Sequence, residues 1–157
     1  MSPPNVPLPN VPPSEKLRFR RRVFTRWSDE DNQNVLNNAL YLTLFEEARL
    51  GWARQLGLLD DNHFPFLLAQ TNVRFVAPGK GGVEVEVELG TTRLGTSSFA
   101  QAYRVRDIAS GAVWAEAEAR LVCYDAATGK SRPMTAQFRG AIVAFEGPFA
   151  ADGSSER

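Results

Sequence analysis

The chain has 157 residues, and 18 lysine and arginine residues balance 18 aspartate and glutamate residues, so the formal net charge at pH 7 is zero. This length fits one domain of ordinary size, and the balanced charge excludes a global electrostatic field that would attract nucleic acid or an anionic membrane. The single cysteine, Cys123, excludes an intrachain disulfide and a cysteine-rich metal site and fits a reducing compartment, so we expect a cytoplasmic protein.

The two ends of the chain have the composition of tails. Residues 2–13 are rich in proline and lack the basic and apolar segments of a secretory signal peptide, so they predict polyproline II structure or disorder. Residues 147–157 read as a second loose tail, and no run long enough to cross a membrane lies between the two ends. We therefore expect a disordered tail over residues 1–16, one folded domain over residues 17–146 and a flexible tail over residues 147–157.

The first expected elements are a strand and a long helix. Residues 18–27 alternate unevenly between apolar and basic side chains, which predicts a strand whose arginines lie on a solvated face. From Asn37 to about Leu56 the apolar residues spread around most of the helical circumference, so this helix is expected to be buried on most sides. Gly57 is a natural C-terminal cap for the helix.

Four strand-like segments follow the helix. They span residues 67–77, 83–92, 98–106 and 113–124, and the short turns between them imply antiparallel neighbours. Residues 83–89 alternate strictly between apolar and acidic side chains, so one face of the sheet is apolar. A helix and a meander of this kind bury their apolar surfaces together when a curved antiparallel sheet wraps around the helix, which is an α+β fold.

A polar loop leads directly into the helix and carries three acids, Asp29, Glu30 and Asp31, among several side-chain amides. The free backbone N–H groups of a first helical turn and the helix dipole favour negative charge at such an entrance. A carboxylate and a site for an oxyanion can therefore share one small space. Capping of the helix is the competing interpretation for Asp31, and Asp29 is expected to fix the loop through local hydrogen bonds.

The spacing of acids, amide and aromatic residue in this segment matches a known pattern. The matching positions are Asp29, Asp31, Asn37 and Tyr41. With them the chain resembles the hotdog-fold acyl-CoA thioesterases of the 4-hydroxybenzoyl-CoA thioesterase type, whose usual pattern is Asp-x-Asp-x-x-Gly-His-Val-x-Asn-x-x-Tyr. Asn34 and Val35 stand where the family usually has glycine and histidine. Asparagine is able to adopt the left-handed backbone of that glycine, whereas the loss of the histidine removes histidine-dependent chemistry at this position.

The resemblance extends over roughly residues 20–146 and implies a hotdog fold and thioester hydrolysis. In the family, the acid that matches Asp31 attacks the thioester carbonyl or activates a water, and both routes stay open here. Backbone N–H groups at the helix start, near residues 36–38, would hold the oxyanion. The catalytic residues that the resemblance implies are Asp31, Gln33, Asn37 and Asn38.

The same resemblance implies where the coenzyme A part of the substrate binds. Residues 93–99 are similar to a family turn in which glycine and serine lie near the pantetheine and the phosphates, and a chain with no net charge needs local cations there. The residues expected to contact the substrate are Lys80, Arg93, Gly95, Ser97 and Ser98. Ordinary solvated turns are the competing interpretation. Because coenzyme A belongs to the acyl-CoA or carrier-protein thioester substrate, no separate cofactor and no metal are expected.

Three alternatives stay open at this stage. Glu46 and Glu47 lie on the expected helix, where other hotdog branches place the catalytic carboxylate. Dehydratases and hydratases share the fold but use a histidine paired with an acid, and the one histidine, His63, falls in a loop after the helix. A non-catalytic protein that binds acyl thioesters or interacts with a partner is the third alternative.

The expected sheet has open edges, which leave rows of unpaired backbone groups that need a partner or a cover. We therefore expect an obligate homodimer, associating further into a homotetramer, in which edge strands of two protomers pair. In the resembling family this seam also forms the substrate tunnel. We expect neither nucleic acid nor a membrane as a partner.

Overall fold

The structure is a computed structural model that describes residues 5–150. Its elements in chain order are η1 (Ser14–Lys16), β1 (Phe19–Phe24), η2 (Trp27–Asp29), α1 (Asn38–Leu56), β2 (Phe66–Phe75), β3 (Glu84–Leu94), β4 (Ser98–Asp107), β5 (Val113–Asp125), β6 (Lys130–Ser131) and α2 (Ala136–Glu146). The expected strands and long helix are confirmed to within a few residues at their ends, whereas α2 has no counterpart among the expected elements.

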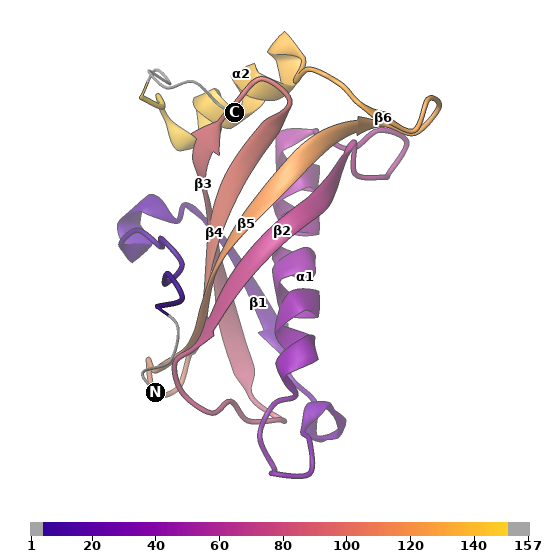
Figure 1. Ribbon diagram of the computed structural model, residues 1–157. Helices are drawn as coiled ribbons and strands as arrows, with labels where there is room; N and C mark the ends of the chain where they lie inside the picture. Colours follow the sequence, from indigo (N-terminus) through magenta and orange to yellow (C-terminus); the bar gives the residue numbers. More distant parts are fainter. Residues whose placement is uncertain (1–4, 151–157) are drawn as a thin grey trace.

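The strands form one antiparallel sheet in the order β1-β3-β4-β5-β2, with the short β6 paired to β5. The long helix α1 runs along one side of this curved sheet (Figure 1). The α+β arrangement expected from the sequence, in which a curved sheet wraps around one long helix, is therefore confirmed. Strands β1 and β2 are the two edges of the main sheet path.

Alternation along β3 explains how the sheet covers the helix. Val85, Val87 and Leu89 point to the helix side and are fully buried, while Glu86 and Glu88 lie on the opposite face, which we call the outer face. In a single chain α1 is buried along one side only, since Leu42 on its other side is 44% exposed. The expected burial of the helix on most sides is therefore not met within one protomer.

Helix α2 closes one end of the sheet. Its N-cap is Thr135, whose side chain accepts a hydrogen bond from the Phe138 N–H (3.1 Å). The Phe138 ring packs against Phe99, with ring centroids 5.6 Å apart, and Phe99 stacks on Trp52 of α1 at 6.0 Å. This aromatic cluster fills the end of the fold that lies farthest from the polar loop (Figure 1).

Residues 7–16 lie across the outer face of the sheet, and we call them the strap. Its contacts with successive strands are Asn72 Nδ2 to Pro7 O (2.9 Å), Asn10 N to Glu118 Oε2 (3.0 Å), Arg104 Nη2 to Pro12 O (3.1 Å) and Ser14 Oγ to Glu88 Oε2 (2.8 Å). The segment was expected to be disordered, but in the structure these hydrogen bonds hold it on the sheet. Proline carbonyls have no helix or sheet ladder to join, and polar side chains of the outer face donate to them instead. Residues 1–4 and 151–157 of the two expected tails lie outside the described residues.

Candidate functional site

The polar loop between η2 and α1 makes a tight turn. The Asp31 N–H donates to the Val35 carbonyl (2.9 Å), and the Asn34 N–H donates to the Asp31 carbonyl (3.0 Å). Asn34 has a φ of 58°, in the left-handed region that glycine favours. Because asparagine tolerates this conformation better than most residues, the turn persists although the family's usual glycine is absent.

This turn is tied to the segment that joins β2 to β3. The Leu36 N–H donates to the Gly79 carbonyl (3.1 Å), and Lys80 Nζ donates to the Asn34 carbonyl (2.9 Å). A predicted substrate-binding residue, Lys80, therefore lies at the polar loop and holds it in place.

Asp29 fixes the start of the loop, as expected from the sequence. Its Oδ2 accepts a hydrogen bond from the Arg26 N–H (2.8 Å), and its Oδ1 accepts one from Arg26 Nη2 (2.9 Å). Burial on its own raises the pKa of Asp29, but the hydrogen bonds and charge of Arg26 outweigh burial and lower it. Both oxygens of Asp29 are thus engaged within the loop, which fits a structural role.

The carboxylate of Asp31 is partly buried and engaged through one oxygen only. Asp31 Oδ1 accepts a hydrogen bond from the Gln33 N–H (2.8 Å), while Oδ2 accepts none from residues 5–150. Helix capping, the competing interpretation for Asp31, is wrong, because Asn37 Oδ1 caps α1 by accepting from the Ala39 N–H (2.9 Å). Asp31 is therefore held through Oδ1, and its Oδ2 is left without a hydrogen-bond donor among the described residues.

The backbone amides at the helix start are not equally available. The Leu36 N–H donates to Gly79, and the Asn37 N–H donates to the Asp29 carbonyl (2.9 Å). The Asn38 N–H has no acceptor within the part of the chain that the structure describes. Of the amides at residues 36–38, that of Asn38, at the first position of α1, is therefore the one without an acceptor among the described residues.

A cleft of about 360 Å³ opens beside these groups. Gln33 and Asn38 contribute its polar lining, and apolar lining comes from Val35, Tyr41 and residues 75–79 at the end of β2. This volume lies within the range of small-molecule sites, which typically combine apolar walls with a few polar groups. Two predicted catalytic residues, Gln33 and Asn38, therefore meet at one cleft, with Asp31 bound to the backbone of the first.

Tyr41 and Gly79 meet in the wall of this cleft. The Tyr41 ring is 2% exposed and meets the Phe75 ring edge-to-face, with centroids 5.3 Å apart. Burial raises the pKa of Tyr41 to about 12, so its hydroxyl stays neutral at physiological pH. A Cβ atom on Gly79 would lie 2.6 Å from the Tyr41 hydroxyl oxygen, so only glycine fits at this position. The sequence pattern included Tyr41, but no sequence signal pointed to the close approach of Gly79.

The other predicted substrate-binding residues lie elsewhere in the protomer. Arg93, Gly95, Ser97 and Ser98 lie at the end of β3 and the start of β4, whereas Lys80 precedes β3. At about 3.3 Å per residue, the two ends of β3 are roughly 30 Å apart. One chain therefore does not bring Lys80 and Arg93 to the same ligand.

The turn between β3 and β4 is also engaged with α2 and the segment before it. Within the turn, the Gly95 N–H donates to the Ser98 carbonyl (2.7 Å). The Gly95 carbonyl accepts a hydrogen bond from Arg139 of α2, and the Thr96 carbonyl accepts one from the Met134 N–H (2.7 Å). The N–H group of Gly95, which could otherwise donate to a phosphate, is thus used inside the protomer.

The alternative catalytic residues, Glu46, Glu47 and His63, lie away from the cleft. Glu46 and Glu47 are exposed on α1, and Glu47 Oε2 lies 4.0 Å from Arg21 Nη2. His63 is exposed in the loop that follows α1, at the end of the helix opposite the polar loop.

Among residues 5–150, no three histidine, cysteine, aspartate or glutamate side chains are placed to hold a metal ion, and no helix has the length and apolar character to cross a membrane.

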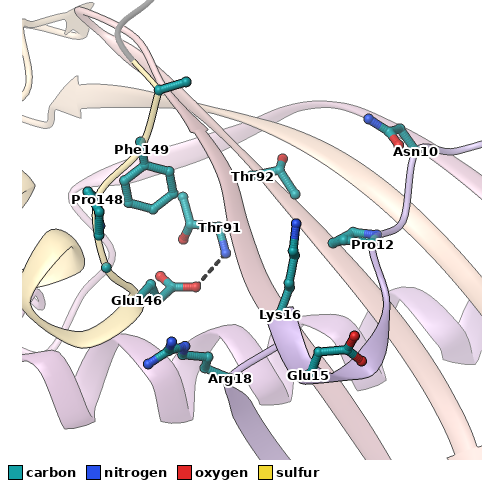
Figure 2. Close-up of a pocket in the computed structure, with 12 residues that line it drawn as sticks. Asn10, Pro12, Glu15, Lys16, Arg18, Thr91, Thr92, Glu146, Pro148 and Phe149 are labelled. Atoms are coloured by element: carbon teal, nitrogen blue, oxygen red, sulfur yellow. Dashed lines mark hydrogen bonds between the residues drawn. The ribbon is translucent and has the colours of Figure 1, made fainter.

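A larger cavity, of about 520 Å³, lies between the strap, β3 and the end of α2 (Figure 2). Its wall includes Lys16, Arg18 and Glu146, and the Glu146 carboxylate accepts hydrogen bonds from the Thr91 N–H and from Trp52 Nε1. Burial raises the pKa of Glu146. None of the predicted site residues lines this cavity, so its size alone does not make it the reactive centre.

The sequence profile of the thioesterase-like superfamily matches residues 25–142, a span that includes the polar loop, α1 and strands β2 to β6. No curated protein matches the chain.

Three solved structures illustrate the similarity. A thioesterase from Thermus thermophilus, complexed with coenzyme A and Zn, is 30% identical; the match covers 82% of this chain and 95% of that chain, with a TM-score of 0.73. The PA2801 protein of Pseudomonas aeruginosa, a putative thioesterase, is 30% identical, with 80% and 98% coverage and a TM-score of 0.71. Slr0204, a 1,4-dihydroxy-2-naphthoyl-CoA thioesterase from Synechocystis, is 22% identical, with 83% and 98% coverage and a TM-score of 0.73, and shares the fold.

Proposed function

Because the chain belongs to the thioesterase-like superfamily and is a thioester hydrolase, we propose that it hydrolyses acyl-CoA in the cleft beside the polar loop. One observation carries the proposal. A carboxylate oxygen, Asp31 Oδ2, and a helix-start amide, the Asn38 N–H, both lack hydrogen-bond partners among residues 5–150; Asn38 lines the cleft, and Asp31 is bonded to the backbone of another cleft residue, Gln33. The first can supply the attacking group or its base, and the second can stabilise the negative charge that develops on the carbonyl oxygen.

Two routes fit this arrangement. In the first, the Asp31 carboxylate attacks the thioester carbonyl, the carbon–sulfur bond breaks, and water then hydrolyses the resulting mixed anhydride. In the second, Asp31 takes a proton from a water that attacks the carbonyl directly. In the first route the leaving thiolate takes a proton from solvent, and hydrolysis of the anhydride restores the Asp31 carboxylate. In the second, the carbon–sulfur bond breaks as Asp31 returns to the thiolate the proton that it took from water. In both routes the Asn38 N–H donates to the oxyanion.

The remaining predicted catalytic residues act as positioning groups in this proposal. The backbone of Gln33 orients the Asp31 carboxylate, and its side chain lines the cleft. Asn37 caps α1 and so fixes the direction of the neighbouring Asn38 N–H. Lys80 steadies the turn through the Asn34 carbonyl.

The proposal includes a homodimer formed through β2. This strand is an edge of the sheet, and Leu67, Leu68 and Phe75 on it are 54%, 43% and 47% exposed. Exposed apolar residues on an unpaired strand favour pairing with a second copy. Because one chain separates Lys80 from Arg93, Gly95, Ser97 and Ser98, we assign these last four to coenzyme A bound at the partner's cleft. Association of dimers into a homotetramer stays a prediction.

The test is thiol release from a panel of acyl-CoA substrates. We expect Asp31→Asn and Asp31→Ala to lower turnover by on the order of a hundredfold or more, with an unchanged circular dichroism spectrum, because a base or nucleophile is lost. Glu47→Gln, which removes an exposed acid from α1, is the matched control and should keep wild-type turnover.

Each other outcome points to a specific error. Near wild-type turnover in Asp31→Ala would refute the role of Asp31 and move attention to Glu46 and Glu47. Hydrolysis of carrier-protein thioesters but not of acyl-CoA would refute the substrate class and leave the mechanism standing. Binding of acyl-CoA without hydrolysis of any thioester would favour the non-catalytic alternative.

A further inference from the structure

The turn that carries Asp31 closes at its base through the pair Glu30 and Leu36. These two residues form an isolated antiparallel bridge, in which the Asp31 N–H donates to the Val35 carbonyl (2.9 Å). Leu36 is buried, whereas Glu30 is half-buried. Because Asp31 follows Glu30 directly in the chain, a contact that fixes Glu30 also limits the movement of Asp31.

Both members of this bridge bind the same short segment between β2 and β3. The Leu36 N–H donates to the Gly79 carbonyl (3.1 Å), and Glu30 Oε1 accepts a hydrogen bond from the Gly81 N–H (2.9 Å). Glu30 Oε2 accepts no hydrogen bond from residues 5–150. The Glu30 side chain therefore makes one hydrogen bond, and this bond joins the base of the turn to the neighbouring segment.

The segment that Glu30 binds is itself held against the end of β1. Thr25 is 4% exposed, and its Oγ1 donates to the Lys80 carbonyl (2.7 Å). The two backbones lie so close that a Cβ atom on Gly81 would overlap the Arg26 carbonyl oxygen. The Gly81 N–H is therefore a fixed donor, and through it Glu30 is anchored to the sheet.

We propose that Glu30 is a positioning residue for thioester hydrolysis, which holds the turn to the Gly81 N–H so that Asp31 keeps its orientation at the cleft. The inference rests on the proposed function, because Glu30 does not line the cleft and affects the reaction only through Asp31. The charge of Glu30 is not needed for this role, since the amide oxygen of a glutamine accepts the same hydrogen bond. What matters is an acceptor at the right distance from Gly81.

The experiment is a double-mutant cycle on thiol release from the thioester that the wild-type protein hydrolyses. We expect Glu30→Ala to lower kcat about tenfold or more with little change in KM, because a small displacement of the reacting carboxylate slows the chemical step. In an Asp31→Asn background, Glu30→Ala should cause no further loss, since the group that it positions is already gone. Circular dichroism at the assay temperature checks that each variant is folded.

Two further variants and a control separate the hydrogen bond from the charge. Glu30→Gln should restore most of the kcat that Glu30→Ala loses, because it keeps an acceptor at the same place. Glu30→Asp keeps the charge but is one methylene shorter, so it should behave like Glu30→Ala. The matched control is Glu84→Ala, which removes a glutamate without a side-chain hydrogen bond among the described residues and should keep wild-type kcat.

The outcomes separate this role from the proposed function. Unchanged kcat in Glu30→Ala, with Asp31→Ala inactive, would overturn the role of Glu30 and leave the proposed function standing. An equal loss from Glu30→Ala with and without Asp31→Asn would also overturn it, since the effect would not act through Asp31. Wild-type turnover in Asp31→Asn would instead refute the proposed function, and with it any positioning of Asp31 by Glu30.

Discussion

Replacement of Glu88 by glutamine should destabilise the fold, because the ion network of the outer face converges on this carboxylate. The Glu88 side chain is 1% exposed. It accepts hydrogen bonds from Ser14 Oγ (2.8 Å), Arg20 Nη1 (2.8 Å), Arg104 Nη1 (3.3 Å) and Arg106 Nε (3.3 Å). The substitution keeps the shape of the side chain and removes the charge that compensates three guanidinium groups.

The expected loss follows from what remains of the network. Breaking a buried ion pair by removing one partner costs about 3–5 kcal/mol. In the variant, Arg104 keeps a second carboxylate partner, Glu116 (3.1 Å), and Arg20 keeps Glu86 (2.9 Å). We therefore expect the loss in the free energy of unfolding to lie near the lower limit of this range. In a domain of this size, a loss of about 3 kcal/mol lowers the melting temperature by roughly 6–12 °C.

The pH dependence of stability gives a second signature. Burial on its own raises the pKa of Glu88, but hydrogen bonds from Ser14 and Arg20 and the charges of Arg20 and Arg106 lower it overall. A carboxyl whose pKa is lower in the folded than in the unfolded state stabilises the fold at pH values above the unfolded-state pKa. This stabilisation is lost as the pH falls through the folded-state pKa. The difference in the free energy of unfolding between wild type and Glu88→Gln should therefore be at its full size at pH 7 and shrink as the pH falls below about 4.5.

Urea unfolding of the two proteins at pH 7 and at pH 3 measures both effects. Glu84→Gln is the control, because Glu84 lies on the same strand and the same face and has no side-chain hydrogen bond with any residue between 5 and 150. If the free energy of unfolding of Glu88→Gln at pH 7 lies within about 1 kcal/mol of the wild-type value, the Glu88 network contributes no more than exposed ion pairs do, and this reasoning is refuted.

Two further substitutions test the candidate site. Gly79→Ala puts a Cβ atom 2.6 Å from the Tyr41 hydroxyl and should lower both the melting temperature and turnover in thiol release. Wild-type values of both would show that Tyr41 moves aside without cost and would refute the requirement for glycine. Lys80→Met removes the donor to the Asn34 carbonyl and should lower kcat several-fold with little change in KM, because the loop is then less well positioned. A raised KM with unchanged kcat would instead mean that Lys80 binds the substrate equally in ground and transition states.

The parts of this fold that could be predicted are those recorded in local patterns. Alternation such as that from Val83 to Leu89 sets strand faces, and the apolar run after Asn37 sets the helix, so the sheet, α1 and the family assignment are confirmed. The polar loop could also be located, because its acids and amides are adjacent in sequence. That Asn37 caps α1 could not be read from the sequence, since several neighbouring residues have a side chain able to do so.

The parts that could not be predicted depend on contacts distant in sequence. Proline content indicated disorder for the strap, because the donors that hold it, Asn72 and Arg104, belong to strands far along the chain. Lys80 and Arg93 are close in sequence, yet the length of β3 separates them. Local spacing carries no information about which end of a strand a residue reaches.

The prolines of the strap also act through the unfolded chain. Each one fixes its own φ near −65° and restricts the residue before it, so the segment is already partly extended before the protein folds. Ordering a segment with so few accessible conformations costs less entropy per residue than ordering an average one. A few hydrogen bonds to the sheet, such as those at Pro7 and Pro12, are then sufficient to hold it. The composition that resembles a disordered tail is thus what makes docking of the strap thermodynamically inexpensive.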